Sequence, residues 1–269
     1  ITSRDLSEGE LHDDATLTPN PLSADQSSVL GKLKLILSDS FEATITADFQ
    51  EWEGDIELNS DETMSFYPVI LNTSESVGVD EGTRERVSLK LDFLGESFFE
   101  NGSINIFTQE TEQEQQTTKS QQTFGNGLQA GPTELSSEFR NYQFNQSIDG
   151  FSAEFFKTIG SDDFRRTHNL VYGFEYESTD TQRPRIRVST NLMTGAQNTF
   201  LGGEYYPNKT FPDTETKRKA FFINDRIEVD ERTAVVFGAR YDGYELNPKA
   251  DALFEANNQT GYQLAEIDD

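Results

Sequence analysis

The chain has 269 residues, with 22 Lys and Arg against 48 Asp and Glu. The resulting formal charge of −26 disfavours binding to the phosphate backbone of nucleic acids. The absence of Cys and the presence of only two His exclude disulfide scaffolds, thiolate metal sites and multi-histidine metal sites. There is no run of about 18 apolar residues, so we expect no transmembrane helix.

Alternation of apolar and polar residues predicts a chain built almost entirely of strands. Between 233 and 242, for example, Val235, Phe237, Ala239 and Tyr241 share one face, and mostly polar or small residues share the other. In chain order the pattern predicts eight strands, over residues 28–38, 41–52, 83–95, 98–112, 137–159, 165–180, 216–229 and 232–247. Most of them reach the length of about 9 to 11 residues that a bilayer crossing requires, whereas soluble strands average about five or six.

The predicted connections alternate between short and long. Short turns are expected at 38–40, 95–97, 160–163 and 230–231, and long polar segments at 53–82, 113–136 and 181–215. Short periplasmic turns that alternate with long extracellular loops are typical of outer-membrane barrels. A compact soluble domain has few structureless loops beyond about 15 residues. We therefore predict an all-β fold, an antiparallel transmembrane β-barrel segment of about eight strands.

The segment 181–215 is the one long connection with a balanced charge. Arg183, Arg185 and Arg187 form a short basic cluster in it, and Tyr205 and Tyr206 follow a Gly-Gly pair. Guanidinium groups pair well with carboxylates, so these five residues are candidate contacts for an anionic cargo. Ordinary solvation of a loop and aromatic anchoring at the membrane interface remain the simpler explanation.

Charged residues on the polar faces of the later strands are expected to pair across neighbouring strands inside the barrel. They are Glu175, Arg226, Glu228, Arg240 and Asp242.

The sequence offers no catalytic or metal-binding motif. It contains no nucleophile elbow, phosphate-binding loop or His-Glu-x-x-His motif, so we expect neither an enzyme nor an intrinsic cofactor or metal. By parity His168 lies on the apolar face beside a short turn, where a structural role is expected. His12 lies in an acidic segment before the first predicted strand, where we expect it to be solvated.

Residues 165–248 carry a resemblance to a known family. Tyr172-Gly-Phe-Glu-Tyr176 ends one strand, Phe221-Phe-Ile223 lies in the next, and Phe237-Gly-Ala-Arg-Tyr-Asp242 closes the third. This order of features resembles the TonB-dependent outer-membrane receptors, and within them the haem and haemoglobin receptors. Residues 28–160 match that family only in their succession of strands joined by alternately short and long connections.

The resemblance implies import of an iron-bearing cargo, haem or a ferric chelate, across the outer membrane of a Gram-negative bacterium. No plug domain can be read, so we expect residues 1–269 to be part of one barrel domain, with loops at 1–27 and 249–269, the second one truncated. Its partners would be the cargo, outer-membrane lipid and, through the plug missing from this chain, the TonB energy-transducing complex. Nucleic acid is not expected as a partner.

Three alternatives remain open at this point. A siderophore receptor of the same family would share the barrel strands and differ in its loops and plug. A secreted β-sandwich, an adhesin or a carbohydrate-binding module, would bury its apolar residues between two sheets and be soluble without detergent. A diffusion porin would also alternate short turns with long loops, but it would not explain the resemblance of residues 165–248 to TonB-dependent receptors.

Overall fold

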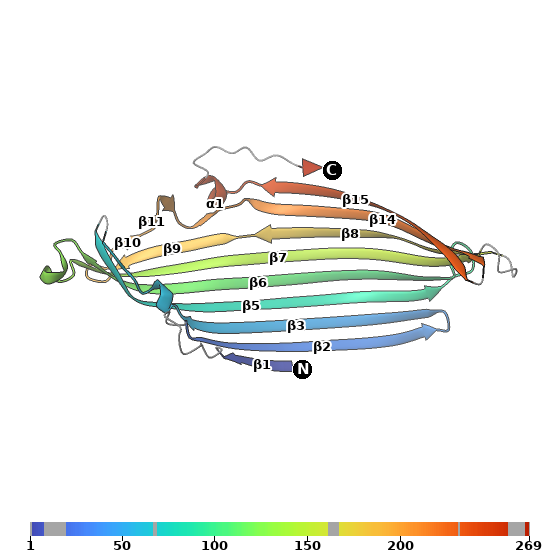
Figure 1. The fold of residues 1–269 in the computed structure, drawn as a ribbon, viewed down its shortest axis with the longest axis horizontal. Helices are drawn as coiled ribbons and strands as arrows, with labels where there is room; N and C mark the ends of the chain where they lie inside the picture. The colour runs from blue at the N-terminus through green and yellow to red at the C-terminus, as the bar shows by residue number, and fades with distance from the viewer. Residues whose placement is uncertain are drawn as a thin grey trace.

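The computed structural model describes residues 2–7, 20–66, 69–160, 167–230, 232–257 and 267–268. Eight long antiparallel strands lie side by side in chain order and form a single large sheet (Figure 1). These strands are β2 (Leu22–Ser38), β3 (Phe41–Glu57), β5 (Ile70–Leu94), β6 (Asn101–Phe124), β7 (Glu134–Ile159), β8 (Thr167–Gln182), β14 (Asp213–Asp230) and β15 (Thr233–Lys249).

Shorter elements occupy the two sheet edges and the long connections. They are β1 (Thr2–Ser7), η1 (Asn59–Asp61), β4 (Met64–Ser65), η2 (Leu128–Ala130), β9 (Pro184–Asn191), β10 (Gln197–Asn198), β11 (Phe200–Leu201), β12 (Glu204–Tyr205), β13 (Asn208–Lys209), α1 (Ala252–Glu255) and β16 (Ile267–Asp268). No helix among the described residues is long and apolar enough to cross a membrane.

All eight predicted strands are present, and their ends beside the short turns are confirmed. The largest difference at these ends is three residues, where β6 begins at Asn101 and the sequence predicts 98. At their opposite ends the strands extend further than predicted: β5 begins at Ile70 instead of 83, and β6 ends at Phe124 instead of 112. Much of the predicted loops 53–82 and 113–136 is therefore strand, because hydrogen bonding between strands continues where the apolar pattern stops.

The ends of the chain also differ from the prediction. The predicted loop 1–27 contains β1, which pairs with β2, and the predicted loop 249–269 contains α1 and β16. His12 and most of the predicted turn at 160–163 lie outside the described residues.

The register places apolar and polar residues on opposite faces of the sheet. One row of paired positions that runs from β2 to β15 is apolar throughout: Leu35, Ala43, Leu91, Ile104, Ala153, Phe174, Phe221 and Tyr241. The adjacent row is polar except at one small residue: Lys34, Thr44, Lys90, Asn105, Ser152, Glu175, Ala220 and Asp242. Since adjacent residues of a strand point to opposite faces, these two rows define an apolar and a polar face.

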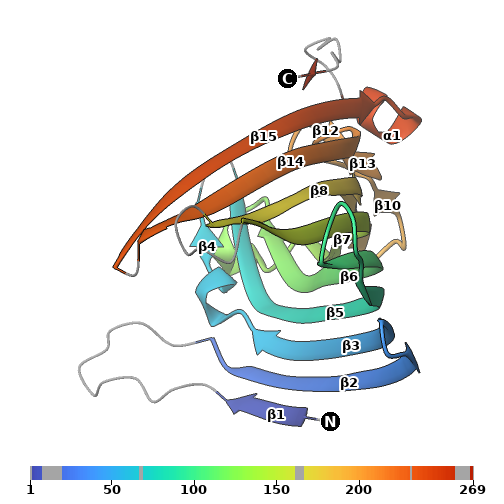
Figure 2. The same ribbon diagram turned by 90° about the vertical axis from the view of Figure 1, so that its right-hand side faces the viewer.

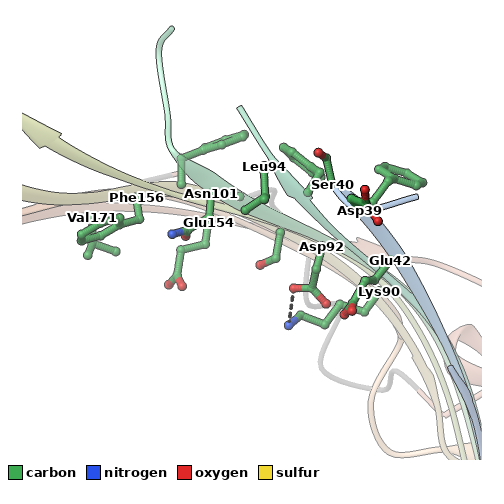
Figure 3. Close-up of a pocket in the computed structure, with 15 residues that line it drawn as sticks. Asp39, Ser40, Glu42, Lys90, Asp92, Leu94, Asn101, Glu154, Phe156 and Val171 are labelled. Carbon is green, nitrogen blue, oxygen red and sulfur yellow. Dashed lines mark ion pairs between the residues drawn. The ribbon is translucent and has the colours of Figure 1, made fainter. Parts of the chain in front are cut away.

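The sheet is curved (Figure 2), and the side chains in Figure 3 place its polar face on the concave side. Figure 3 shows Glu42, Asp92 and Glu154 projecting on the concave side near the short turns. The opposite, convex face exposes large apolar side chains on the consecutive strands β2, β3, β5 and β6, for example Leu33, Ile45, Leu89 and Ile106, and on β14, for example Phe221. A contiguous apolar surface of this kind marks contact with a membrane or another apolar partner.

Aromatic rings gather on the convex face close to the short turns. The ring centroids of Phe93 and Phe99 lie 5.2 Å apart, and those of Phe155 and Tyr172 lie 5.5 Å apart. Gly102 lies among them, and a Cβ at this position would lie only 2.7 Å from the ring of Phe93. Such rings form the girdle of a membrane barrel at its interface with water.

His168 lies on the convex face near the same end of the sheet. Its Nδ1 is 2.7 Å from Oδ2 of Asp225 on the neighbouring strand β14. This pairing agrees with the structural role predicted for His168.

Candidate functional site

The connection between β8 and β14 is folded rather than open. β9 continues the path of β8 along β7, so that Arg185 pairs with Tyr142 after Gln182 has paired with Asn145. β10 and β13 both pair back onto β9. A small hairpin of β11 and β12 projects from this base and turns at Gly202 and Gly203, with φ of 64° and 87°. Both angles lie in the left-handed region that glycine adopts without strain.

Arg185 and Tyr206 converge on a single carboxylate. Nη2 of Arg185 and the hydroxyl of Tyr206 donate to the same oxygen, Oε2 of Glu204, over 2.9 Å and 2.7 Å. Nε of Arg185 donates to Oδ1 of the fully buried Asn208 over 3.0 Å. Glu204 and Asn208 therefore bind two adjacent donors of the Arg185 guanidinium, Nη2 and Nε.

Arg187 binds a different carboxylate. Its Nε and Nη2 donate to the two oxygens of Glu138 over 2.8 Å and 3.0 Å, a bidentate pair. Arg140 donates to the same carboxylate, which is only 5% exposed. Glu138 is thus a buried anchor that joins β7 to β9.

The remaining two candidates lie apart from this cluster. Arg183 is exposed, with its guanidinium carbon 5.0 Å from the centre of the Phe144 ring. Tyr205 is 58% exposed and packs against Phe200, with ring centroids 4.6 Å apart. The structure therefore brings together three of the five predicted residues, Arg185, Arg187 and Tyr206, and leaves Arg183 and Tyr205 accessible at its margin.

The cluster extends along the concave face of the sheet. Glu138 and Glu154 are both even-numbered residues of β7, whose pairing with β6 has no register shift, so they share the concave face. Towards β6, Lys119 is paired with Asp61 at 2.5 Å. We call this set the mouth cluster; its members are Asp61, Lys119, Glu138, Arg140, Arg185, Arg187, Glu204 and Tyr206. Its four cations outnumber its three carboxylates, in a chain whose formal charge is −26.

The loop members of the mouth cluster have shifted pKa values. The hydrogen bond from Tyr206, together with the nearby Arg185, lowers the pKa of Glu204. Burial is the main cause that raises the pKa of the Tyr206 hydroxyl. The hydrogen bond from Lys119 lowers the pKa of Asp61. Each shift favours the charged carboxylates and the neutral phenol that these contacts require.

Sequence reasoning did not identify the carboxylates of this cluster. Glu138 and Arg140 lie on β7, far in sequence from Arg187, and only the pairing of β7 with β9 brings them together. Glu204 lies within the Gly-Gly-Glu-Tyr-Tyr segment, and its position before the tyrosines was the only local signal.

The predicted pairing across strands of the concave face is confirmed for Arg240 and Glu175, which lie 2.6 Å apart. Two further pairs each lie within a single strand: Arg240 with Asp242 at 2.9 Å, and Arg226 with Glu228 at 3.8 Å. The pair between Arg240 and Glu175 crosses the intervening strand β14.

This crossing passes over Ala220, which is paired with both Glu175 and Asp242 and is fully buried. A small residue at this position leaves room for the guanidinium of Arg240 above it.

A hollow lies at the opposite end of the concave face from the mouth cluster (Figure 3). It has a volume of about 690 Å³, and its polar lining includes Glu42, Lys90, Asp92 and Glu154. Lys90 is paired with Asp92 at 2.8 Å. These four residues comprise three carboxylates and one cation, so negative charge is in excess here. Its charge balance is the reverse of that in the mouth cluster.

The comparison with known families decides the class of the protein. The sequence model of the family described as TonB dependent receptor-like, beta-barrel matches residues 32–263. The chain belongs to this family. Its members are non-enzymatic transporters of the Gram-negative outer membrane and carry no intrinsic cofactor. No curated protein matches the chain.

Membership also separates the alternatives. A β-sandwich packs two sheets face to face, whereas one large sheet with an exposed apolar convex face is observed here. A TonB-dependent receptor acts on a specific cargo with the TonB protein, which distinguishes it from a diffusion porin. The convex face is accordingly the lipid-facing surface of the barrel.

Proposed function

We propose that this chain forms part of the barrel of a receptor that imports an iron-bearing cargo, haem itself or haem taken from a haemoprotein. The observation that carries the proposal is the mouth cluster, a cation-rich group on the concave face of an acidic protein. Carboxylates such as the propionates of haem pair well with guanidinium groups. The resemblance of residues 165–248 to haem receptors supports the same cargo.

We also propose that the barrel is completed by further strands of the same receptor. Among the described residues, β1 pairs only with residues 23–28 of β2, and β16 pairs only with Glu245 and Leu246 of β15. The outer edges of 29–38 and 233–244 thus have no described partner, although these stretches carry the apolar band. Backbone groups in the hydrocarbon region require hydrogen-bond partners, so additional strands would have to cover both edges.

The contact with the TonB energy-transducing complex is proposed to run through a plug domain. The concave face offers the polar lining that a plug inside the barrel would contact. Outer-membrane lipid would contact the convex face.

A siderophore is the second candidate cargo. Ferric siderophores that carry carboxylates would meet the same guanidinium groups, so the mouth cluster favours an anionic cargo of either kind.

A growth experiment tests the cargo. The intact receptor is expressed in a Gram-negative host without its own haem and siderophore receptors, with haem or a ferric carboxylate siderophore as the only iron source. We expect growth on haem that requires TonB and is weakened by Arg185→Ala. Lys249→Ala is the matched control, since Lys249 pairs with Asp180 and Glu215 outside the mouth cluster. Growth on the siderophore alone would replace haem with the second candidate, and growth on neither would refute an iron-bearing cargo.

A further inference from the structure

We propose that Glu204 occupies a carboxylate-binding site on this chain, and that a carboxylate of the cargo replaces it. The site consists of the guanidinium of Arg185, the hydroxyl of Tyr206 and the side chain of Asn257. This inference rests on the proposed import of an anionic cargo, and it names the group of the cargo that the mouth cluster binds.

Groups from three separate segments converge on the carboxylate of Glu204. Arg185 and Tyr206 donate to Oε2 over 2.9 Å and 2.7 Å, and the side chain of Asn257 forms a further hydrogen bond with Glu204. Arg185 lies on β9, Tyr206 follows β12, and Asn257 follows α1. A set of this kind recognises a carboxylate through charge and direction, and it does not require that the carboxylate belong to the same chain.

The binding groups are held in place independently of Glu204. Asn208 is fully buried, accepts a hydrogen bond from Nε of Arg185, and donates to the carbonyl oxygen of Tyr205 over 2.6 Å. Tyr206 is 7% exposed, and its backbone N–H donates to the carbonyl oxygen of Thr199 over 2.9 Å. The site therefore keeps its shape when the carboxylate leaves, which lowers the cost of binding another one.

Glu204 itself lies on a small flap, residues 200–204, above the hydrogen bond between Tyr206 and Thr199 that closes its base. The hairpin that includes it has two pairs of residues in register, Phe200 with Tyr205 and Leu201 with Glu204, and it forms a sheet separate from the large one. Its turn passes close over Arg187, because a Cβ at Gly202 would lie 3.4 Å from Nη1 of that residue. Movement of the flap would therefore release Glu204 and uncover Arg187 at the same time.

The two carboxylates that bind arginine in the mouth cluster differ in exposure. The side chain of Glu138 is 6% exposed and holds two arginines, whereas that of Glu204 is 37% exposed. Removing Glu138 would leave two partly buried guanidinium groups without this partner, at a cost in stability. A more exposed ion pair contributes less to stability, so a cargo carboxylate can exchange with Glu204.

Binding of an iron-free carboxylate to the purified intact receptor tests this inference. The probe is tricarballylate, and its dissociation constant is measured by equilibrium dialysis for the unchanged receptor and for Glu204→Gln. If Glu204 fills the site most of the time, its removal should tighten probe binding by about tenfold or more. Arg185→Ala added to Glu204→Gln should abolish this gain.

Glu134→Gln is the matched control, because Glu134 accepts a hydrogen bond from Asn191 on β9 and is no part of the site. It removes one negative charge from the same region and should leave probe binding unchanged. An equal gain in both variants, or no gain in Glu204→Gln, would overturn the proposal.

A second measurement needs no substitution. Tricarballylate added to the unchanged receptor should raise hydrogen exchange of the flap amides 200–204, since the flap loses its anchor. Unchanged flap exchange at saturating probe would also overturn the proposal. Because the probe carries no iron, a receptor that exchanges Glu204 for tricarballylate but fails to support growth on haem or a siderophore would refute the cargo and leave the carboxylate site standing.

Discussion

Leu89→Arg is the sharpest test that the convex face meets lipid. Leu89 is paired with Ile45 and Ile106, so an arginine there finds no carboxylate in its own row. Phe237 is a weaker choice, because it is paired with Asp225, which would attract the new cation. An arginine near the middle of the apolar band costs about 2–4 kcal/mol, which corresponds to a shift of about 30-fold to 1000-fold in the folding equilibrium.

The assay is urea unfolding of the intact receptor reconstituted in phospholipid vesicles. The control is Ser88→Arg, which adds the same side chain at the adjacent residue on the concave face, where water solvates it. We expect Leu89→Arg to lose stability and Ser88→Arg to change it by less than about 1 kcal/mol. Equal losses in the two variants, or no loss in Leu89→Arg, would refute the assignment of the two faces.

Three further predictions concern Ala220, Gly102 and the contact of Glu204, and they are tested by unfolding and hydrogen-exchange measurements. Ala220→Leu should lower the unfolding free energy by about 1–3 kcal/mol, because the larger side chain displaces Arg240 from its ion pairs; an unchanged urea midpoint would contradict this. Gly102→Val should cost a similar amount, because a Cβ there would lie 2.7 Å and 2.9 Å from two Phe rings; Gly31→Val, where a Cβ meets nothing closer than 3.9 Å, is the control. The hydrogen bond from Tyr206 lowers the pKa of Glu204 below 4.5, so its contribution is complete above that pH and is lost as the pH falls through the lower folded value. Exchange of the flap amides should therefore rise under acid conditions, and a variant that lacks the Glu204 carboxylate should not show this rise.

The fold could be predicted from the sequence where lipid imposes a pattern. Between Val87 and Phe93 on β5, for example, every second residue is apolar because the convex face meets hydrocarbon. The same constraint fixed the ends beside the short turns, since the strands leave the membrane there after only a few residues. These are the regions where prediction and structure agree.

The far halves of the strands could not be predicted in the same way. Over Gln113–Thr118 both faces of β6 meet water, so polar residues fill every position and no period of two remains. The strand persists because its backbone is hydrogen-bonded to β5 and β7. Hydrogen bonding between backbones leaves no signature in the side chains.

The candidate site was partly predictable for a related reason. The arginines and tyrosines drew attention because they are close in sequence and unusual in an acidic chain. Their partners follow only from the pairing of strands that are distant in sequence. Arg187 is paired with Arg140 across β7 and β9, and Glu138 is the next residue of β7 on the same face as Arg140. The fold decides which guanidinium binds a carboxylate of the same chain. Arg185 and Arg187 do so, whereas Arg183 lies over the ring of Phe144.

The length of the central strands determines where cargo is first met. β5, β6 and β7 have 25, 24 and 26 residues. At about 3.4 Å per residue and a tilt of about 40°, they rise about 65 Å, whereas the apolar band is about 25 Å tall. The upper part of the sheet therefore stands about 40 Å clear of the hydrocarbon, above the lipid phosphates and the sugars attached to them. A carrier protein too bulky to enter that sugar layer can deliver its cargo at this height, and only the released small molecule has to descend.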